Sequence, residues 1–300
     1  MNNAATRRAI LTGGAALAFL AAATKMPKGT GLKPPAAPAV QTLDIRDADG
    51  RIVPIRVWRP GGKPLGTLLF SHGANSNAAK YDALTAAFAD AGWLTAAILH
   101  ADSPDRPEPR PQGAAGLARR LVEAQATLDW LSEQHRDLPM VAAGHSFGAL
   151  IALILAGART LAFPTEADPR VRAALAFSPP GAFPGFIDAK GMAKIARPIW
   201  VQTGTADALP PMIPDWQSHR LAFDNATVTP RLLWIGDGVD HYFGNRIGRP
   251  ERPFSEPQAR LFQAATDNAL DFAAATALAD PAARARLDTA PAGVTITLKT

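Results

Sequence analysis

The chain of 300 residues contains no cysteine, and only 19% of its residues are charged. The lack of cysteine excludes disulfides, thiolate metal sites, iron–sulfur clusters and a cysteine nucleophile, so covalent chemistry must use serine, threonine, lysine or a carboxylate. The sequence also lacks an H-E-x-x-H pattern and a glycine-rich phosphate loop, so we expect neither a metal nor a cofactor. What is present, 47% hydrophobic residues, is typical of a globular protein.

The net charge of +5 comes entirely from the first 43 residues. These residues include no acidic side chain, whereas the rest of the chain carries equal numbers of basic and acidic side chains. A neutral body has no overall field that would gather polyanions, so we expect no nucleic-acid partner. The basic residues of this segment are Arg7, Arg8, Lys25, Lys28 and Lys33.

The N-terminal segment has the features of an export signal. Its arginine pair precedes an alanine-, leucine- and glycine-rich run of 15 residues over 9–23, shorter than the about 20 residues that span a bilayer. Ala21 and Ala23 are the small residues that a signal peptidase accepts. The pattern resembles a twin-arginine leader, so we expect a signal within residues 1–33, a linker over 34–40, and a periplasmic protein with no stable membrane insertion after cleavage. An uncleaved anchor or a disordered extension is the alternative.

The rest of the chain alternates between two patterns. Residues 43–47 and 52–57 flank Asp49-Gly50 with alternating polarity, which predicts a hairpin at the edge of a sheet. Short unbroken apolar runs follow, as expected of strands buried on both faces. These runs cover residues 67–70, 94–99, 140–143, 173–177, 199–202 and 232–235.

Stretches with helical spacing lie between these runs, over 81–91, 117–134, 146–156, 214–223 and 256–278. In the second stretch the leucines form an apolar stripe, and we expect Arg119, Arg120, Glu123 and Glu133 mainly on the opposite, polar side. Strands alternating with helices predict an α/β fold: a mostly parallel sheet, entered through an antiparallel N-terminal hairpin, with helices on both faces. One domain over 41–280 is favoured. Residues 281–300 are a tail, whose VTITL segment is either an added edge strand or a disordered end.

The pentapeptide Gly144-His145-Ser146-Phe147-Gly148 is the motif that carries chemistry. It follows a predicted strand and opens a predicted helix, which is the context of a nucleophile elbow. The flanking glycines suit so tight a turn, and the helix N-terminus would stabilise an alkoxide that forms beside Ser146.

A serine nucleophile needs a base, and the base needs an acid to orient it. On such elbows the chain order is serine, acid, histidine, which selects His241 in the loop after the last apolar run. Asp207 lies just past the end of the preceding strand and is the favoured acid. Asp237 and Asp240, in the same loop as the histidine, are its competitors.

The loop after the first central strand should provide a donor to the oxyanion. It reads Phe70-Ser71-His72-Gly73-Ala74-Asn75, so the backbone N–H groups of Ala74 and Phe147 are the candidate donors, and His72 is expected to brace the loop as a buried imidazole. Asn75, Trp216 and Phe243 are candidate substrate contacts, although each aromatic residue is as well explained as part of the core or a loop.

The segments FSHG, GHSFG, TGTAD and DHYF together resemble the α/β-hydrolase superfamily, and within it the dienelactone hydrolase-like and platelet-activating-factor acetylhydrolase-like group. The resemblance covers about residues 41–278. It implies the α/β-hydrolase fold and a serine hydrolase. Dienelactone hydrolase itself uses a cysteine nucleophile, so its lactone specificity does not carry over. The acetylhydrolases place their acid after the strand that corresponds to 173–177, where this chain has Ser178-Pro179-Pro180.

Only residues 178–198 separate the strands between which many α/β-hydrolases insert a cap, so we expect no large cap domain and an open cleft. The sequence therefore predicts a serine hydrolase that cleaves a small-molecule or polymeric carboxylic ester through an acyl-enzyme, with Ser146, His241 and Asp207 as its triad. A peptidase of the prolyl-oligopeptidase type and a non-catalytic binding protein on the same fold are the alternatives.

Overall fold

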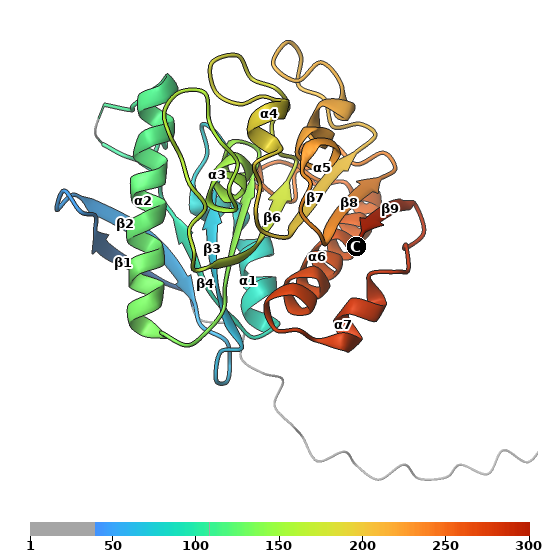
Figure 1. Cartoon of the computed structure of the whole chain (residues 1–300), viewed down its shortest axis with the longest axis horizontal. Helices are drawn as coiled ribbons and strands as arrows, with labels where there is room; N and C mark the ends of the chain where they lie inside the picture. The colour runs from blue at the N-terminus through green and yellow to red at the C-terminus, as the bar shows by residue number, and fades with distance from the viewer. Residues whose placement is uncertain (1–39, 108) are drawn as a thin grey trace, which may run out of the picture. The chain divides into compact units, whose positions relative to one another are not determined.

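A computed structural model describes residues 40–107 and 109–300. The expected export signal and most of the linker lie outside these residues. The described chain forms a nine-stranded sheet in the order β1-β2-β4-β3-β5-β6-β7-β8-β9, which crosses Figure 1 from the blue strands to the red strand. The strands are β1 Val40–Arg46, β2 Ile52–Trp58, β3 Gly66–Ser71, β4 Trp93–Ile98, β5 Met140–His145, β6 Val171–Phe177, β7 Ile199–Gly204, β8 Arg231–Gly236 and β9 Val294–Lys299.

Antiparallel pairs form both edges of this sheet. The predicted N-terminal hairpin is confirmed, since β1 pairs with β2 in the register Leu43↔Ile55, and β2 continues antiparallel onto β4. At the other edge β9 pairs with β8 in the register Trp234↔Ile296. The VTITL segment is therefore an edge strand and not a disordered end. All neighbouring pairs from β4 to β8 are parallel, as the unbroken apolar runs predict.

The core consists of two apolar layers, one on each face of the sheet. Side chains alternate along a strand: Leu69 packs in the layer with α2 and α3, whereas its neighbours Leu68 and Phe70 pack in the layer with α1 and α6. Helices on both faces are thereby confirmed. The helices are α1 Asp82–Asp90, α2 Gly113–Gln134, α3 Phe147–Leu155, α4 Ala189–Met192, α5 Leu221–Asn225, α6 Glu256–Ala277 and α7 Pro281–Arg286, with 3-10 helices η1 Ala78–Tyr81 and η2 Trp216–Arg220.

The prediction that Arg120 and Glu123 lie on a polar face of α2 is wrong. Arg120 and Glu123 are fully buried, with 0% of each residue exposed. They lie at the border of the apolar stripe, where the helix contacts β3 and β4. Charged partners, and not solvent, surround them there.

Short segments connect the strands at the carboxyl end of the sheet. Between β6 and β7 the chain makes the bridge Phe183↔Ile187 and the single turn α4, so this connection holds no cap domain. Among the described residues, no helix combines the length and the apolar character needed to cross a membrane. Because the parallel strands all end at the same edge, the residues that follow β3, β5, β6, β7 and β8 meet there.

Candidate active site

Ser146 lies in a strained turn between β5 and α3. Its backbone has φ +55° and ψ −122°, a conformation that costs a non-glycine residue about 1–3 kcal/mol and that is characteristic of functional sites. The flanking glycines are required by close packing. A side chain on Gly144 would clash with the carbonyl of Gly148, and one on Gly148 would clash with the carbonyl of Ser71. The turn therefore holds the serine at the strand end, with the N-terminus of α3 directly after it.

The structure brings Asp207 and His241 together. Asp207 Oδ1 lies 2.7 Å from His241 Nδ1, and both side chains are almost completely buried. The competing carboxylates are engaged elsewhere: Asp240 accepts from the backbone N–H groups of Tyr242 and Gly244, and the exposed Asp237 accepts from a threonine hydroxyl. This contact leaves His241 Nε2 as the ring nitrogen able to accept a proton.

The other oxygen of Asp207 is held by two hydroxyl groups. Ser178 Oγ donates to Oδ2 at 2.7 Å and Thr203 Oγ1 at 3.2 Å. Ser178 directly follows β6 and, like Ser146, has a positive φ, +47°. With both oxygens occupied by donors, the carboxylate has a fixed orientation.

A second histidine, His219, also contacts Asp207, and it was missed in the sequence because η2 carries it among polar residues. Its Nε2 lies 2.9 Å from Asp207 Oδ1, as an ion pair whose N–H points off the direct line. Its Nδ1 lies 2.5 Å from the carbonyl oxygen of Pro179. A carbonyl only accepts, so Nδ1 carries a proton. A bare Nε2 would then face the carboxylate with its lone pair, so this geometry favours the doubly protonated imidazolium of His219.

The electrostatics of these groups agree with that assignment. Burial opposes the charge of His219, but its close contact with the Asp207 carboxylate raises the pKa of His219 above its usual value. Burial alone would raise the pKa of Asp207, yet His219 and His241 hold it well below its usual range. The ionised carboxylate of Asp207 is thus favoured well below the pH at which a free aspartate takes up a proton.

His145, the second residue of the elbow motif, points beneath the site and not into it. Its Nε2–H donates to the carbonyl oxygen of His241 at 2.7 Å, and its Nδ1 accepts from the Tyr81 hydroxyl at 2.9 Å. That hydroxyl accepts from Gly73 N–H at 3.2 Å. Burial, followed by the charge of His241, lowers the pKa of His145 to about 3, and burial raises the pKa of Tyr81 to about 12. This relay of neutral groups ties the loop after β3 to the loop that carries His241.

The loop after β3 lies directly against the nucleophile. A Cβ on Gly73 would lie 3.4 Å from Ser146 Cβ. The expected burial of His72 is confirmed: it is 0% exposed, and its Nε2 accepts from the backbone N–H of His100 at 3.2 Å. Ala74 is exposed and Phe147 half-buried, on the two segments that flank the serine.

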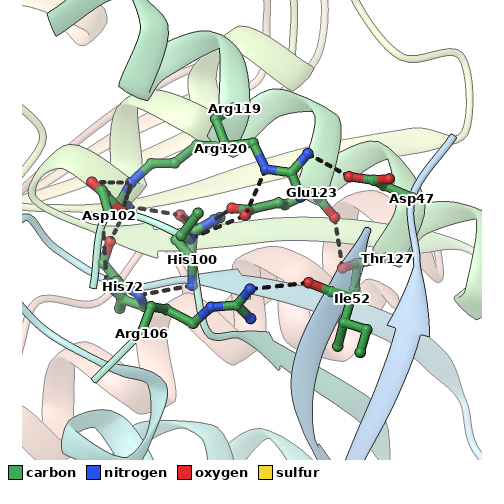
Figure 2. Close-up of polar contacts among 12 residues, drawn as sticks. Asp47, Ile52, His72, His100, Asp102, Arg106, Arg119, Arg120, Glu123 and Thr127 are labelled. Carbon is green, nitrogen blue, oxygen red and sulfur yellow. Dashed lines mark hydrogen bonds and ion pairs between the residues drawn. The ribbon is translucent and has the colours of Figure 1, made fainter. Parts of the chain in front are cut away.

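A cluster of buried charged groups supports this loop from below (Figure 2). Arg120, on α2, donates to the carbonyl oxygens of the loop and to Asp102. Glu123 accepts from Arg119 and from the backbone N–H of residue 101, and its Oε2 lies 2.7 Å from His100 Nδ1. Burial raises the pKa of Glu123 to about 7, and burial with the charge of Arg120 holds the pKa of His100 well below its usual value. Sequence patterns could not find this cluster, because its members are far apart along the chain.

The three predicted substrate contacts differ in their positions. Asn75 is exposed, with φ +52°, and its Oδ1 accepts from Arg110 at 3.5 Å. Trp216 opens η2 and is half-buried. The prediction for Phe243 is wrong: it is 0% exposed, because its ring inserts between Trp234 and the α6 residue Phe262. It is a core aromatic.

Asp207, His219 and His241 also have the residue types of a metal site, and one ligand atom of each lies within 4.8 Å of the others. In this arrangement they bind one another. The separation of 2.7 Å between His241 Nδ1 and Asp207 Oδ1 is that of a direct hydrogen bond and leaves no room for an ion between these two atoms. The chemistry of the set is therefore that of an acid and its histidines.

Comparisons with known proteins agree on the fold. The sequence model of the family described as serine aminopeptidase S33 matches residues 62–228. Mouse (Mus musculus) monoglyceride lipase is 26% identical over 117 residues, which are 39% of this chain and 38% of the lipase. An α/β serine hydrolase homologue from Coxiella burnetii has a TM-score of 0.57 at 19% identity, over 76% of this chain and 96% of that one. A protein assigned as a dienelactone hydrolase from Klebsiella pneumoniae has a TM-score of 0.56 at 17% identity, over 75% and 96%.

These matches confirm the predicted α/β-hydrolase fold. The structural neighbours are less than 25% identical and show the fold alone. The chain spans less than two fifths of the length of the lipase that it matches. The family model ends before His241, so His241 is a candidate base through its contact with Asp207 and not through the match.

Proposed function

This chain belongs to the serine aminopeptidase S33 family, and we propose that it hydrolyses carboxylic esters through an acyl-enzyme formed on Ser146. The observation that carries the proposal is the buried Asp207–His241 pair, at 2.7 Å, on the loops beside the strained serine. The backbone of His241 is tied to the elbow itself by the hydrogen bond from His145. A non-catalytic protein on this fold would have no need of such strain beside a paired acid and histidine.

The groups divide the reaction as follows. Ser146 Oγ attacks the ester carbonyl while His241 Nε2 takes the hydroxyl proton, and Asp207 stabilises the imidazolium. The N–H groups of Ala74 and Phe147 donate to the oxyanion of the tetrahedral intermediate. Its collapse breaks the ester bond, and the alcohol leaves with the proton from His241. Water then attacks the acyl-enzyme by the same route, which releases the acid and restores the serine.

An aminopeptidase activity is the second candidate, because the family carries that description. Cleavage after a free amino terminus requires a group that binds the ammonium of the substrate. Two arginines lie on the loops near the site: Arg110 contacts Asn75, and the guanidinium carbon of Arg249 lies 3.7 Å from the Tyr242 ring centroid. Cations there repel an ammonium group, which favours the ester.

The test is labelling with a fluorophosphonate probe, followed by rates on a panel of 4-nitrophenyl esters and aminoacyl 4-nitroanilides. Ser146→Ala should abolish the label and lower kcat by about 10⁴- to 10⁶-fold. The matched control is Ser132→Ala, whose hydroxyl bonds to a carbonyl within α2 and should leave both readouts unchanged. Labelling that survives Ser146→Ala in folded protein would contradict the nucleophile. Faster turnover of the anilides than of the esters would favour the aminopeptidase.

A further inference from the structure

The guanidinium of Arg120 is a buried cation that contacts backbone carbonyls next to the nucleophile. Its Nε lies 3.0 and 2.9 Å from the two oxygens of Asp102. Its Nη1 donates to the carbonyl oxygen of His72 at 2.5 Å, and its Nη2 donates to that of Gly73 at 3.2 Å (Figure 2). A planar guanidinium offers its donors in a fixed geometry, so it holds two successive peptide groups in one orientation.

The second of these peptide groups is the one that carries the candidate oxyanion donor. The carbonyl of Gly73 and the N–H of Ala74 belong to the same peptide bond. When a cation donates to the carbonyl oxygen, the peptide is polarised and its N–H becomes a stronger donor. The effect is largest in a site from which water is excluded, as it is around the 0% exposed Arg120.

Arg120 also contacts the segment that carries the other candidate donor. Its guanidinium carbon lies 4.9 Å from the ring centroid of Phe147, the residue directly after the serine. The two segments are packed without spare room, because a side chain on Gly148 would clash with the carbonyls of Ser71 and His72. One side chain therefore contacts both halves of the proposed oxyanion hole.

A buried ion pair such as Arg120–Asp102 is weak evidence for a role in stability. Buried ion pairs are often no more stabilising than apolar residues of similar volume, because the desolvation of both ions opposes their attraction. Burial indeed lowers the pKa of Arg120, and Asp102 opposes that shift. A single charged side chain that bonds to the loop backbone thus indicates a role in the site.

We propose that Arg120 is a positioning residue of the oxyanion hole, which holds the loop after β3 by its carbonyls and polarises the Gly73–Ala74 peptide toward the reacting ester. The inference rests on the proposed ester hydrolysis at Ser146. It assigns no contact between Arg120 and the substrate, since the side chain is buried beneath the loop.

The test compares Arg120→Lys with Arg119→Gln in the full chain. Lysine keeps the charge but loses the two-carbonyl fork. Arg119 is the adjacent arginine, bonded to Asp47 and Glu123 and not to the loop, so it is the matched control. We measure kcat and KM on a 4-nitrophenyl ester, and the inhibition constant of phenylboronic acid, whose tetrahedral adduct with serine places an oxygen in the oxyanion hole.

For Arg120→Lys we expect kcat to fall about 10- to 100-fold, less than the about 10²- to 10³-fold cost of removing an oxyanion donor, with KM nearly unchanged. The boronate inhibition constant should rise by a similar factor. Arg119→Gln should change both by less than about twofold. Wild-type kcat in folded Arg120→Lys, a fall in kcat without weaker boronate binding, or equal losses in both variants would each overturn the proposal.

If Arg120→Lys does not fold, as judged by circular dichroism and Tm, Asp102→Asn takes its place. Asp102 orients the guanidinium through Nε without touching the loop carbonyls, so its loss should produce the same paired change on a smaller scale. Unchanged kcat and boronate affinity in folded Asp102→Asn would also overturn the inference. Failure of the proposed function is distinct: the wild-type protein would then show neither ester turnover nor a Ser146-dependent label.

Discussion

Two buried polar clusters lie on opposite sides of the Ser146 elbow, and they act on it in different ways. The acid–histidine cluster comes from the loops after the strands. Its charged groups contact the side chain of His241, which would transfer the proton. The arginine cluster is built from α2 and the ends of β3 and β4, and it contacts the backbone. Chemistry is thus assigned to loops, and orientation to a helix of the scaffold. The first cluster comprises Ser178, Asp207, His219 and His241, and the second comprises His72, His100, Asp102, Arg120 and Glu123.

The pKa values of the buried carboxylates in the two clusters are shifted in opposite directions. Asp207 is surrounded by donors on both oxygens, and its two histidines hold its pKa well below the usual range. Glu123 is buried to a similar extent, yet desolvation dominates and raises its pKa to about 7. Both carboxylates have partners on both oxygens, so the difference lies in the balance: two histidines outweigh desolvation at Asp207, whereas Arg119 and the backbone N–H of residue 101 do not outweigh it at Glu123.

The strongest way to break the comparison is Asp207→Asn. An amide keeps the volume but donates where His241 Nδ1–H needs an acceptor, so the imidazole takes the wrong tautomer. We expect kcat on esters to fall by about 10³- to 10⁴-fold, while fluorophosphonate labelling slows in proportion. The matched control is Asp237→Asn, an exposed candidate acid that contacts only Thr205 among the described side chains. Comparable losses in both variants would contradict the assignment of the acid.

The second prediction concerns stability, and it isolates the arginine cluster. The folded-state pKa of Glu123, about 7, exceeds its ordinary value of 4.5, so between these pH values the native state binds more protons than the unfolded state. The contribution of Glu123 to the free energy of unfolding should therefore fall as pH rises through this window, by about 3 kcal/mol at most, whereas His100 and His145, whose folded-state pKa values are lowered, contribute in the opposite direction. Urea unfolding at about pH 5 and about pH 7.5 measures it. The free energy of unfolding of the wild type minus that of Glu123→Gln isolates the Glu123 contribution and should fall between these two pH values. A difference that does not change with pH would refute the prediction.

The fold and the residues of the candidate triad could be predicted largely from local patterns. Each central strand is an unbroken apolar run, and each run ends beside a residue type suited to chemistry. Because parallel strands end at one edge, order along the chain was enough to place His241 near the Ser146 elbow and Asp207 as the favoured acid.

The supporting groups could not be predicted in this way. Arg120 and Glu123 fit the polar side of an amphipathic helix, and only the packing of α2 over β3 and β4 shows that this side is buried. His219 lies on a short 3-10 helix whose position depends on the fold around it. Phe243 was wrongly predicted to contact the substrate. It has a positive φ and its ring is buried in the core, and residue spacing does not reveal either feature.

The smallest predicted effect concerns His219, the second histidine that contacts Asp207 Oδ1. Its replacement sharpens the contrast between the clusters, because it removes one partner of the carboxylate and leaves His241 in place. His219 faces Asp207, the ring of His241 at 5.7 Å and the carbonyl of Pro179, with neutral His145 beyond His241. Asp215 and Arg220 are the charged side chains of its own helix, and both point to solvent-accessible partners.

In His219→Gln the carboxylate acts on His241 alone. The predicted effect is on stability. Because the folded-state pKa of His219 is raised, its contribution is complete below its ordinary pKa and disappears as pH rises through the raised value. The free energy of unfolding of the wild type minus that of His219→Gln, measured by urea unfolding from about pH 5 to about pH 9, should therefore fall as pH rises. His135→Gln, at the end of α2, is the control, and its difference from the wild type should show no such fall. A His219→Gln difference that stays constant or grows with pH would contradict the raised pKa of His219.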